Sequence, residues 1–154
     1  MPSTSSIPAF LDALKVLLDA RPGLQGPPAV TVATGDLAAE TPREAIILAA
    51  ARGPRATAGL RNPAAGGVPR NQDTVVFGAI WIVKPGQGET VIKAARDRAY
   101  ALLGEVEQTL LANPQVGGSC MWAFIGTDSI DQGVNDQGRW AQVDFEITYR
   151  ARLV

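Results

Sequence analysis

One glycine-rich segment of this sequence has the composition of an anion-binding loop. Residues 84–90 (KPGQGET) join a predicted strand to a predicted helix, and main-chain N–H groups at such a junction can hold a phosphate. The segment lacks the Walker pattern and the third glycine of the dinucleotide fingerprint, and Glu89 would repel a phosphate. We therefore interpret it as a tight turn in which Glu89 stabilises the positive end of the following helix.

A second segment, residues 126–138 (GTDSIDQGVNDQG), carries carboxylates that could bind calcium. Asp128, Asp131 and Asp136 would supply oxygen ligands, together with Asn135. A calcium loop of the EF-hand type needs acidic groups at alternate positions, a central glycine and a closing glutamate, and that order is absent. We predict a solvated hairpin loop here and no metal site.

The remaining reactive side chains do not combine into a catalytic group. Cys120 lies in an apolar segment without a basic neighbour, which favours a buried structural thiol. Glu105 and Glu107 fall on different faces of a predicted helix, so they form no acid/base pair. The chain has no histidine and one cysteine, which removes Ser–His and Cys–His nucleophiles, histidine zinc sites and an internal disulfide. The three tryptophans are interpreted as core or interface aromatics. We predict no enzymatic activity, no catalytic residue and no cofactor.

The distribution of charge is the one chemical pattern that remains. The formal net charge is −1, which argues against a dedicated nucleic-acid binder. Over residues 41–72 five arginines stand against one glutamate, whereas over residues 97–146 eight carboxylates stand against two arginines. One interpretation is ordinary surface scatter. The other is that the basic segment of one copy lies on the acidic side of the next, in a head-to-tail contact that closes into a ring when the rotation permits. The subunit-interface residues would then be Arg52, Arg55, Arg61, Arg70, Asp128, Asp131 and Asp136.

The hydrophobic periodicity predicts the elements that position these side chains. Residues 89–112 have a helical stripe that Asn113-Pro114 ends, and residues 142–153 alternate between apolar and polar side chains as a half-buried strand does. The expected elements in chain order are a helix over 7–18, strands over 29–34, 44–51 and 74–84, a helix over 89–112, and strands over 120–125 and 142–153.

These elements predict an α+β domain of two layers. Two amphipathic helices need a surface, and a mixed, mainly antiparallel sheet of about five strands supplies one, with both helices on one face. The length of 154 residues fits a single domain, 1–154, and no apolar run is long enough to cross a membrane. Residues 53–73 do not fit a minimal domain, because structureless loops beyond roughly 12–15 residues are uncommon. We interpret them as a flexible basic loop or assembly arm.

Three stretches of this sequence resemble the lambda-type tail terminator proteins of long-tailed (siphovirus-like) bacteriophages. They are the first helix (IPAFLDALKVLLDA), the turn into the long helix (KPGQGETVIKAARDRAYALLGEVEQTLLANP) and the closing strand (GRWAQVDFEITYRARL). The resemblance covers nearly the whole chain and rests on the order of elements. Family members carry a long loop that orders on assembly, and residues 53–73 occupy the place of such an arm.

The resemblance implies a structural virion protein in the tail–neck region, present in the host cytoplasm during assembly. Tail terminators form a homo-oligomeric ring, usually a hexamer, that caps the head-proximal end of the tail tube and stops its polymerisation. The ring contacts the tail tube protein and offers a head–tail joining surface to the head-completion (connector) protein. DNA passes through it without sequence-specific binding, and neither catalysis nor a membrane is involved.

Three alternatives stay open at this point. Another phage neck, head-completion or tail tube protein would share the same assembly physics. A small anion-binding module would require residues 86–90 to bind a phosphate, contrary to the interpretation as a turn. A chromosomal adaptor for protein–protein interaction is the third.

Overall fold

The computed structural model describes residues 5–26, 29–35, 42–48, 56–61 and 70–153, with the backbone alone described for 56–61, 70 and 153. The first helix, α1 (Ile7–Asp19), forms as predicted, with a proline in its first turn, where a missing N–H costs nothing. Its buried face consists of Phe10, Leu14 and Leu18, one helical turn apart. A short 3-10 turn, η1 (Pro22–Leu24), follows and buries Leu24.

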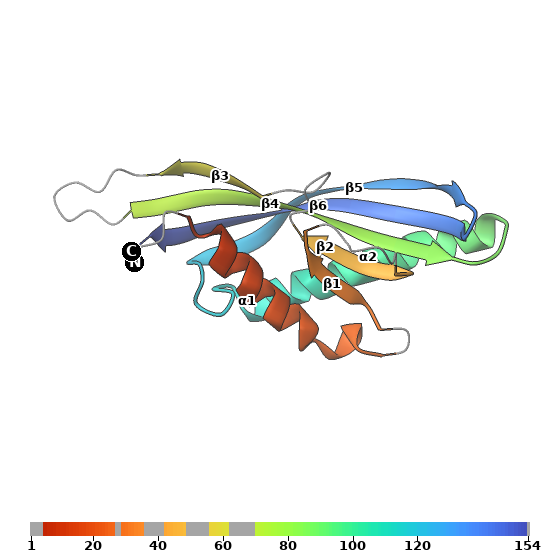
Figure 1. Cartoon of the computed structure of the whole chain (residues 1–154), viewed down its shortest axis with the longest axis horizontal. Coiled ribbons are helices and arrows are strands. Elements are labelled where there is room, and N and C mark those ends of the chain that lie inside the picture. The colour runs from red at the N-terminus through yellow and green to blue at the C-terminus, as the bar shows by residue number, and fades with distance from the viewer. Residues whose placement is uncertain (1–4, 27–28, 36–41, 49–55, 62–69, 154) are drawn as a thin grey trace.

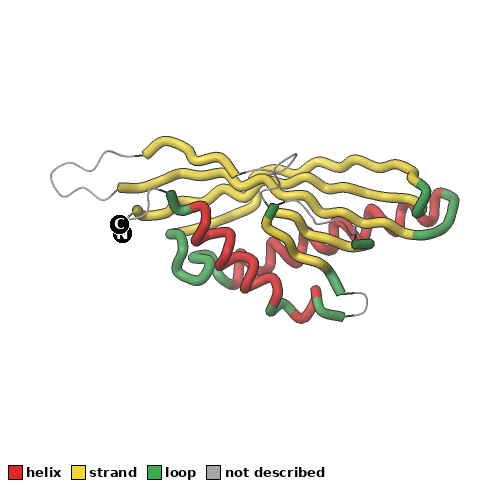
Figure 2. Tube along the Cα trace, in the orientation of Figure 1, coloured by secondary structure: helices red, strands yellow, loops and turns green. Residues whose placement is uncertain are grey.

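One six-stranded sheet organises the fold (Figures 1 and 2). Its strands are β1 (Thr31–Thr34), β2 (Glu44–Leu48), β3 (Ala56–Arg61), β4 (Arg70–Lys84), β5 (Trp122–Asn135) and β6 (Gly138–Leu153). The order is β1-β2-β4-β6-β5, and β3 pairs with β4 off this path. The β1–β2 pair is parallel and the other pairs are antiparallel. The predicted mixed, mainly antiparallel sheet is confirmed.

Both helices lie on the same face of this sheet, which confirms the predicted two-layer α+β arrangement (Figure 1). The long helix α2 (Glu89–Ala112) has the predicted bounds. Its buried stripe includes Ala99, Leu102, Val106 and Leu110. The opposite side of the sheet, on which neither described helix lies, is called the helix-free face below.

Two predicted loops are in large part strand. Within residues 53–73, β3 covers Ala56–Arg61 and β4 already begins at Arg70, while 53–55 and 62–69 lie outside the described residues. Within residues 126–138, β5 continues to Asn135 and β6 begins at Gly138, so the solvated loop predicted there is wrong. Few of these residues are apolar, and they are held extended by pairing with the central strands β4 and β6.

The core lies between the helices and the alternate residues of β4 and β6 that face them. On β6 these are Val143, Phe145, Ile147 and Tyr149, all buried, as the alternation predicts. Phe145 packs directly against Gly78 of the neighbouring strand, where an added Cβ would overlap the ring. The glycine therefore makes room for the phenylalanine.

A buried polar network joins the start of α1 to the sheet. The Ser6 main-chain N–H and hydroxyl both donate to Gln72 Oε1, at 2.9 and 2.6 Å. Because the Ser6 hydroxyl donates there, the Tyr149 hydroxyl is the donor in its 2.9 Å bond to Ser6 Oγ. The Tyr149 ring also stacks on Phe10, with 3.9 Å between centroids. Burial raises the pKa of Tyr149, so its hydroxyl keeps its proton and can donate. This network fixes where the first helix begins on the sheet.

A buried ion pair ties β2 to the long helix. The carboxylate of Glu44 is 3% exposed, and Arg98 Nε donates to both of its oxygens, at 3.0 and 3.1 Å. Lys84 Nζ lies 4.0 Å from the same carboxylate. A buried charge needs such partners to offset the loss of its hydration. These contacts therefore hold the start of β2, the end of β4 and one turn of α2 together.

Candidate functional site

The side chains that could have formed a catalytic or ligand-binding site are separated from one another or have structural partners. Glu105 pairs with Arg21 at 2.6 Å, whereas Glu107 is exposed elsewhere on the helix. Gly86 and Gly88 adopt positive φ in the turn before α2, and Glu89 stands in the first helical turn. Over the described part of the chain, no three His, Cys, Asp or Glu side chains gather where they could hold a metal ion.

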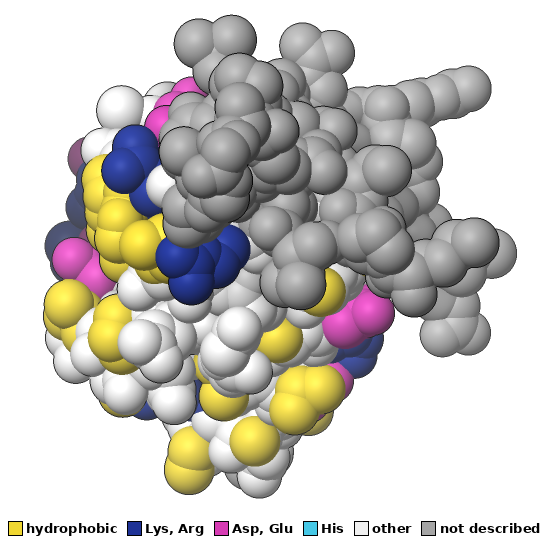
Figure 3. Space-filling view, turned by 90° about the vertical axis from the view of Figure 1, so that its left-hand side faces the viewer, with side chains coloured by type: hydrophobic (Ala, Val, Ile, Leu, Met, Phe, Trp, Pro, Cys, Tyr) yellow, Lys and Arg dark blue, Asp and Glu magenta, His cyan; other side chains and the backbone are white. Residues whose placement is uncertain are grey.

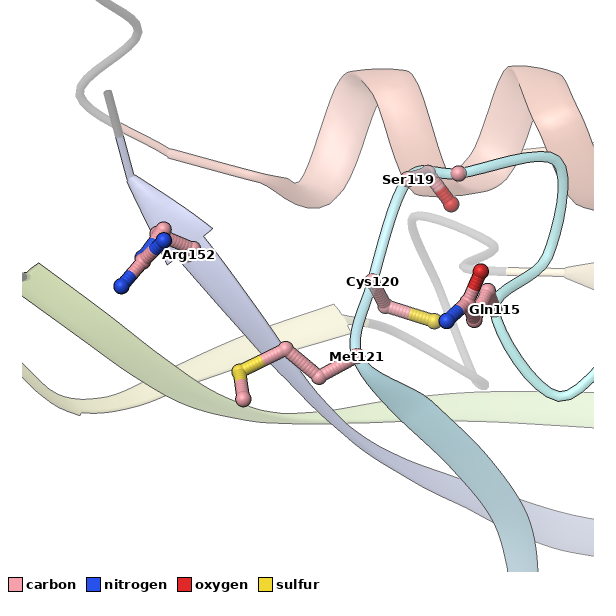
Figure 4. Close-up of a pocket in the computed structure, with 6 residues that line it drawn as sticks. Gln115, Ser119, Cys120, Met121 and Arg152 are labelled. Atoms are coloured by element: carbon pink, nitrogen blue, oxygen red, sulfur yellow. The ribbon is translucent and has the colours of Figure 1, made fainter.

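The Cys120 thiol is buried at the edge of a pocket of about 510 Å³. This pocket lies between the loop that follows α2 and the end of β6, and its lining residues are Gln115, Gly118, Ser119, Cys120, Met121 and Arg152 (Figure 4). The Cys120 side chain points toward Gln115, away from Arg152 and Met121. Burial raises the pKa of the Cys120 thiol to about 11. The prediction of a buried structural thiol is thus confirmed.

Cys120 is expected to react at pH 8 about a hundredfold more slowly in the folded protein than in the unfolded protein. A pKa of about 11 in place of the usual value near 9 lowers the thiolate fraction by roughly that factor, and only the thiolate is nucleophilic. The measurement is the rate of colour release from an aromatic disulfide reagent, with and without denaturant. C120A is the blank, and equal rates in the two states would contradict the burial of the thiol.

The structure distributes the predicted interface residues over two opposite ends of the sheet. Arg52 and Arg55 lie outside the described residues, Arg61 is the last residue of β3, and Arg70 is the first of β4. Asp128 and Asp131 lie on β5 and Asp136 in the turn after it, all exposed. The acidic residues therefore belong to one hairpin.

The strand register gathers four arginine positions at one end of the sheet. Arg61 pairs with Gln72, Gln72 with Ala151, and Arg70 with Leu153, which places these positions beside Arg150 and Arg152. We call this the basic end, defined by positions Arg61, Arg70, Arg150 and Arg152. Figure 3 views it directly, and Lys or Arg side chains lie there beside hydrophobic ones. Positions that are far apart in the sequence thus become neighbours in the fold.

Arg150 is held on the helix-free face by an aromatic ring and a carboxylate. Its guanidinium lies 5.7 Å from the centre of the Trp122 ring and donates to both oxygens of Asp73, at 2.6 and 3.0 Å. These bonds hold the pKa of Asp73 below its usual range. Trp122 in turn stacks on Phe124, with 5.3 Å between centroids. By contrast, Arg152 makes no ion pair within the described residues.

The other end of the same strands is an acidic hairpin, formed by residues 126–146 of β5 and β6. It carries five carboxylates, and within the described residues none of them makes an ion pair with a lysine or arginine. These residues are Asp128, Asp131, Asp136, Asp144 and Glu146. Alternation along the strands places Asp131, Asp144 and Glu146 on the helix-free face. Asp128 faces the helix side and accepts a hydrogen bond from the Tyr100 hydroxyl at 3.2 Å. Burial and this carboxylate raise the pKa of Tyr100.

The turn of the acidic hairpin is too far from the basic end for their charges to neutralise each other within one molecule. β5 has 14 residues and is therefore about 45 Å long. The hairpin turn lies at one limit of this length and the basic end at the other (Figure 1). At physiological salt the Debye length is only about 8 Å, so the two charged regions do not interact across the strand. The sheet thus exposes complementary charge at opposite ends.

The sequence did not single out two arginines of the basic end, Arg150 and Arg152. It also did not single out two apolar side chains near them, Met121 and Phe124. Residues 120–125 form an apolar run, which predicts a strand without saying which side chains are exposed. In the structure Met121 and Phe124 are about half exposed. The available signal was the alternation of the closing strand, which places Arg150 and Arg152 on its polar face.

No family model and no curated protein match this chain. Among solved structures, a chain described as "Virion of native gene transfer agent (GTA) particle" is similar over 98% of this chain and 98% of that chain, with 12% sequence identity and a TM-score of 0.42. A likeness of this degree carries no argument about the function of this chain. None of the described helices is long and apolar enough to cross a membrane.

Proposed function

We propose that this chain is a structural virion protein whose copies assemble into a ring, a hexamer, at the head-proximal end of a phage tail tube. The ring ends polymerisation of the tube and offers the surface to which the head-completion protein joins. The whole chain acts as one domain, with residues 53–73, which include β3 and the start of β4, as its assembly arm. The sequence resemblance to lambda-type tail terminators supports this role.

The observation that carries the proposal is the separation of charge along the sheet. The basic end and the turn of the acidic hairpin lie about 45 Å apart on the same strands, which leaves each end free to contact its counterpart on another molecule. A contact between two different patches is heterologous, and it closes into a ring when the rotation between neighbours divides a full turn. Arg52, Arg55, Arg61 and Arg70 of one copy then face Asp128, Asp131 and Asp136 of the next.

The helix-free face suits a surface that DNA must pass without adhering. Asp144 and Glu146 stand on it along β6, and neither makes an ion pair within the described residues. Carboxylates repel the phosphate backbone, whereas affinity for DNA grows with the number of phosphates that Lys and Arg neutralise. We place this part of the face toward the lumen of the ring.

Light scattering coupled to size exclusion, at low and high protein concentration, tests the proposal. We expect a discrete ring-sized species, or a monomer that converts to it as concentration rises, and electron microscopy of that species then gives its symmetry. High salt should shift the equilibrium toward the monomer, because the contact is electrostatic.

Two other results would contradict a terminator. Open-ended filaments would indicate a tube subunit, since a terminator stops at a ring. A monomer at every concentration would contradict self-assembly and favour an anion-binding module. In that case phosphate or nucleotides should raise the melting temperature, because a ligand that binds only the folded state stabilises it.

A further inference from the structure

The acidic hairpin exposes apolar side chains as well as charge. Ile130 and Val134 are four residues apart on β5 and so lie on the same side of the strand, and they are 39% and 61% exposed. An exposed isoleucine and valine on one side of an edge strand cost solvation free energy unless another surface covers them. The hairpin therefore has an apolar contact to offer in addition to its carboxylates.

The basic end also exposes apolar side chains. Met121 and Phe124 are 49% and 52% exposed, and Phe124 stacks on Trp122, which holds its ring in place. The 510 Å³ pocket opens between Met121 and Arg152 (Figure 4). Arg152 makes no ion pair within the described residues. Exposed apolar side chains beside an arginine have the composition of a protein–protein contact.

We propose that the acidic hairpin of one copy docks on the basic end of a second copy, with Ile130 and Val134 covering Phe124. Arg152 then faces Asp128, the carboxylate on the same side of β5 as Ile130 and Val134. This inference rests on the proposed ring and assigns its subunit contact to the ordered sheet, in addition to the basic arm. The occupant is a second copy because the hairpin carries carboxylates that complement Arg152, together with the uncovered side chains of Ile130 and Val134.

Thiol cross-linking tests this contact directly. In the F124C/V134C variant the two new thiols are ten residues apart on one strand, about 33 Å, which a short bifunctional maleimide cannot span. Cys120 does not interfere, because it is buried and its pKa is about 11. We expect a ladder of covalent multimers up to the ring size from F124C/V134C, and none from F124C or V134C alone.

The V16C/F124C variant is the matched control. Val16 lies on α1 and is 66% exposed, close to the exposure of Val134, but it does not belong to the hairpin. This variant should give no ladder. Likewise, V134S should weaken assembly about tenfold or more, whereas V16S should leave it unchanged, because only Val134 loses a buried contact.

The possible results separate the docking contact from the ring itself. Rings of the unmodified protein with no ladder from F124C/V134C, or V134S rings as stable as those of V16S, would overturn the docking contact and leave the ring. Cross-linked dimers from F124C alone would indicate a symmetric contact and likewise overturn it. Absence of any assembly of the unmodified protein would overturn the ring and the docking contact together.

Discussion

Replacing Phe145 by alanine is expected to lower the free energy of unfolding by about 3–5 kcal/mol. The side chain is 2% exposed at the centre of β6 and is one of the largest in the core. Its ring fills the space over Gly78, where the neighbouring strand has no side chain, so truncation leaves a cavity that the backbone cannot close. Denaturant titration followed by tryptophan fluorescence measures the loss at a protein concentration where the chain is monomeric.

Gly78, which pairs with Phe145 across the two strands, supplies an independent check on this packing. G78A should itself cost about 1–3 kcal/mol, because the new methyl group overlaps the Phe145 ring. In the G78A/F145A variant the two costs should not add, since the methyl group then enters the cavity. L111A is the control, because Leu111 is 66% exposed and its truncation should change stability by less than about 0.5 kcal/mol. Additive costs for Gly78 and Phe145 would contradict their contact.

Replacing Arg98 by methionine is expected to destabilise the fold by about 2–4 kcal/mol. The variant keeps the Glu44 carboxylate buried but removes the guanidinium that donates to both of its oxygens. The expected loss is below that of a fully enclosed pair, because Arg98 is 32% exposed and Lys84 remains 4.0 Å from the carboxylate. Denaturant titration at neutral pH measures it.

Two further variants identify the cause of that loss. E44Q/R98M removes both charges, so it should be more stable than R98M, in which one charge stays buried with a single distant partner. K93M removes a cation from an exposed pair on the same helix, Lys93 with Asp97, and should cost less than about 0.5 kcal/mol. If R98M were no less stable than K93M, the buried ion pair would not stabilise the fold.

Local sequence was sufficient to predict the elements whose apolar residues follow a regular period within one segment. Helix α2 begins at Glu89 and ends at Ala112, as its apolar stripe and Asn113-Pro114 predict. The closing strand alternates as predicted and extends four residues further toward its start, to Gly138. In both cases a regular period distinguishes a buried face from an exposed one within a single segment.

The candidate site was predictable only in its charges. The excess of arginine before residue 72 and of carboxylates after residue 97 is visible in the sequence. That Asp128, Asp131 and Asp136 belong to a paired hairpin and not to a loop is not visible, because polar residues such as those of 126–135 form a strand only when a neighbour holds them there. Likewise, the exposure of Met121 and Phe124 depends on what covers the strand.

The sequence by itself determined the α+β class, both helices, the polar face of the last strand and the lack of histidine chemistry, because these follow from composition and from periods within one segment. Only the tertiary structure decided which distant residues meet. The register of β4 with β6 places Gly78 against Phe145 and Arg70 opposite Leu153, and the length of β5 separates the basic end from the turn of the acidic hairpin. Register is a relation between strands, set by packing of the whole sheet, so no single segment encodes it.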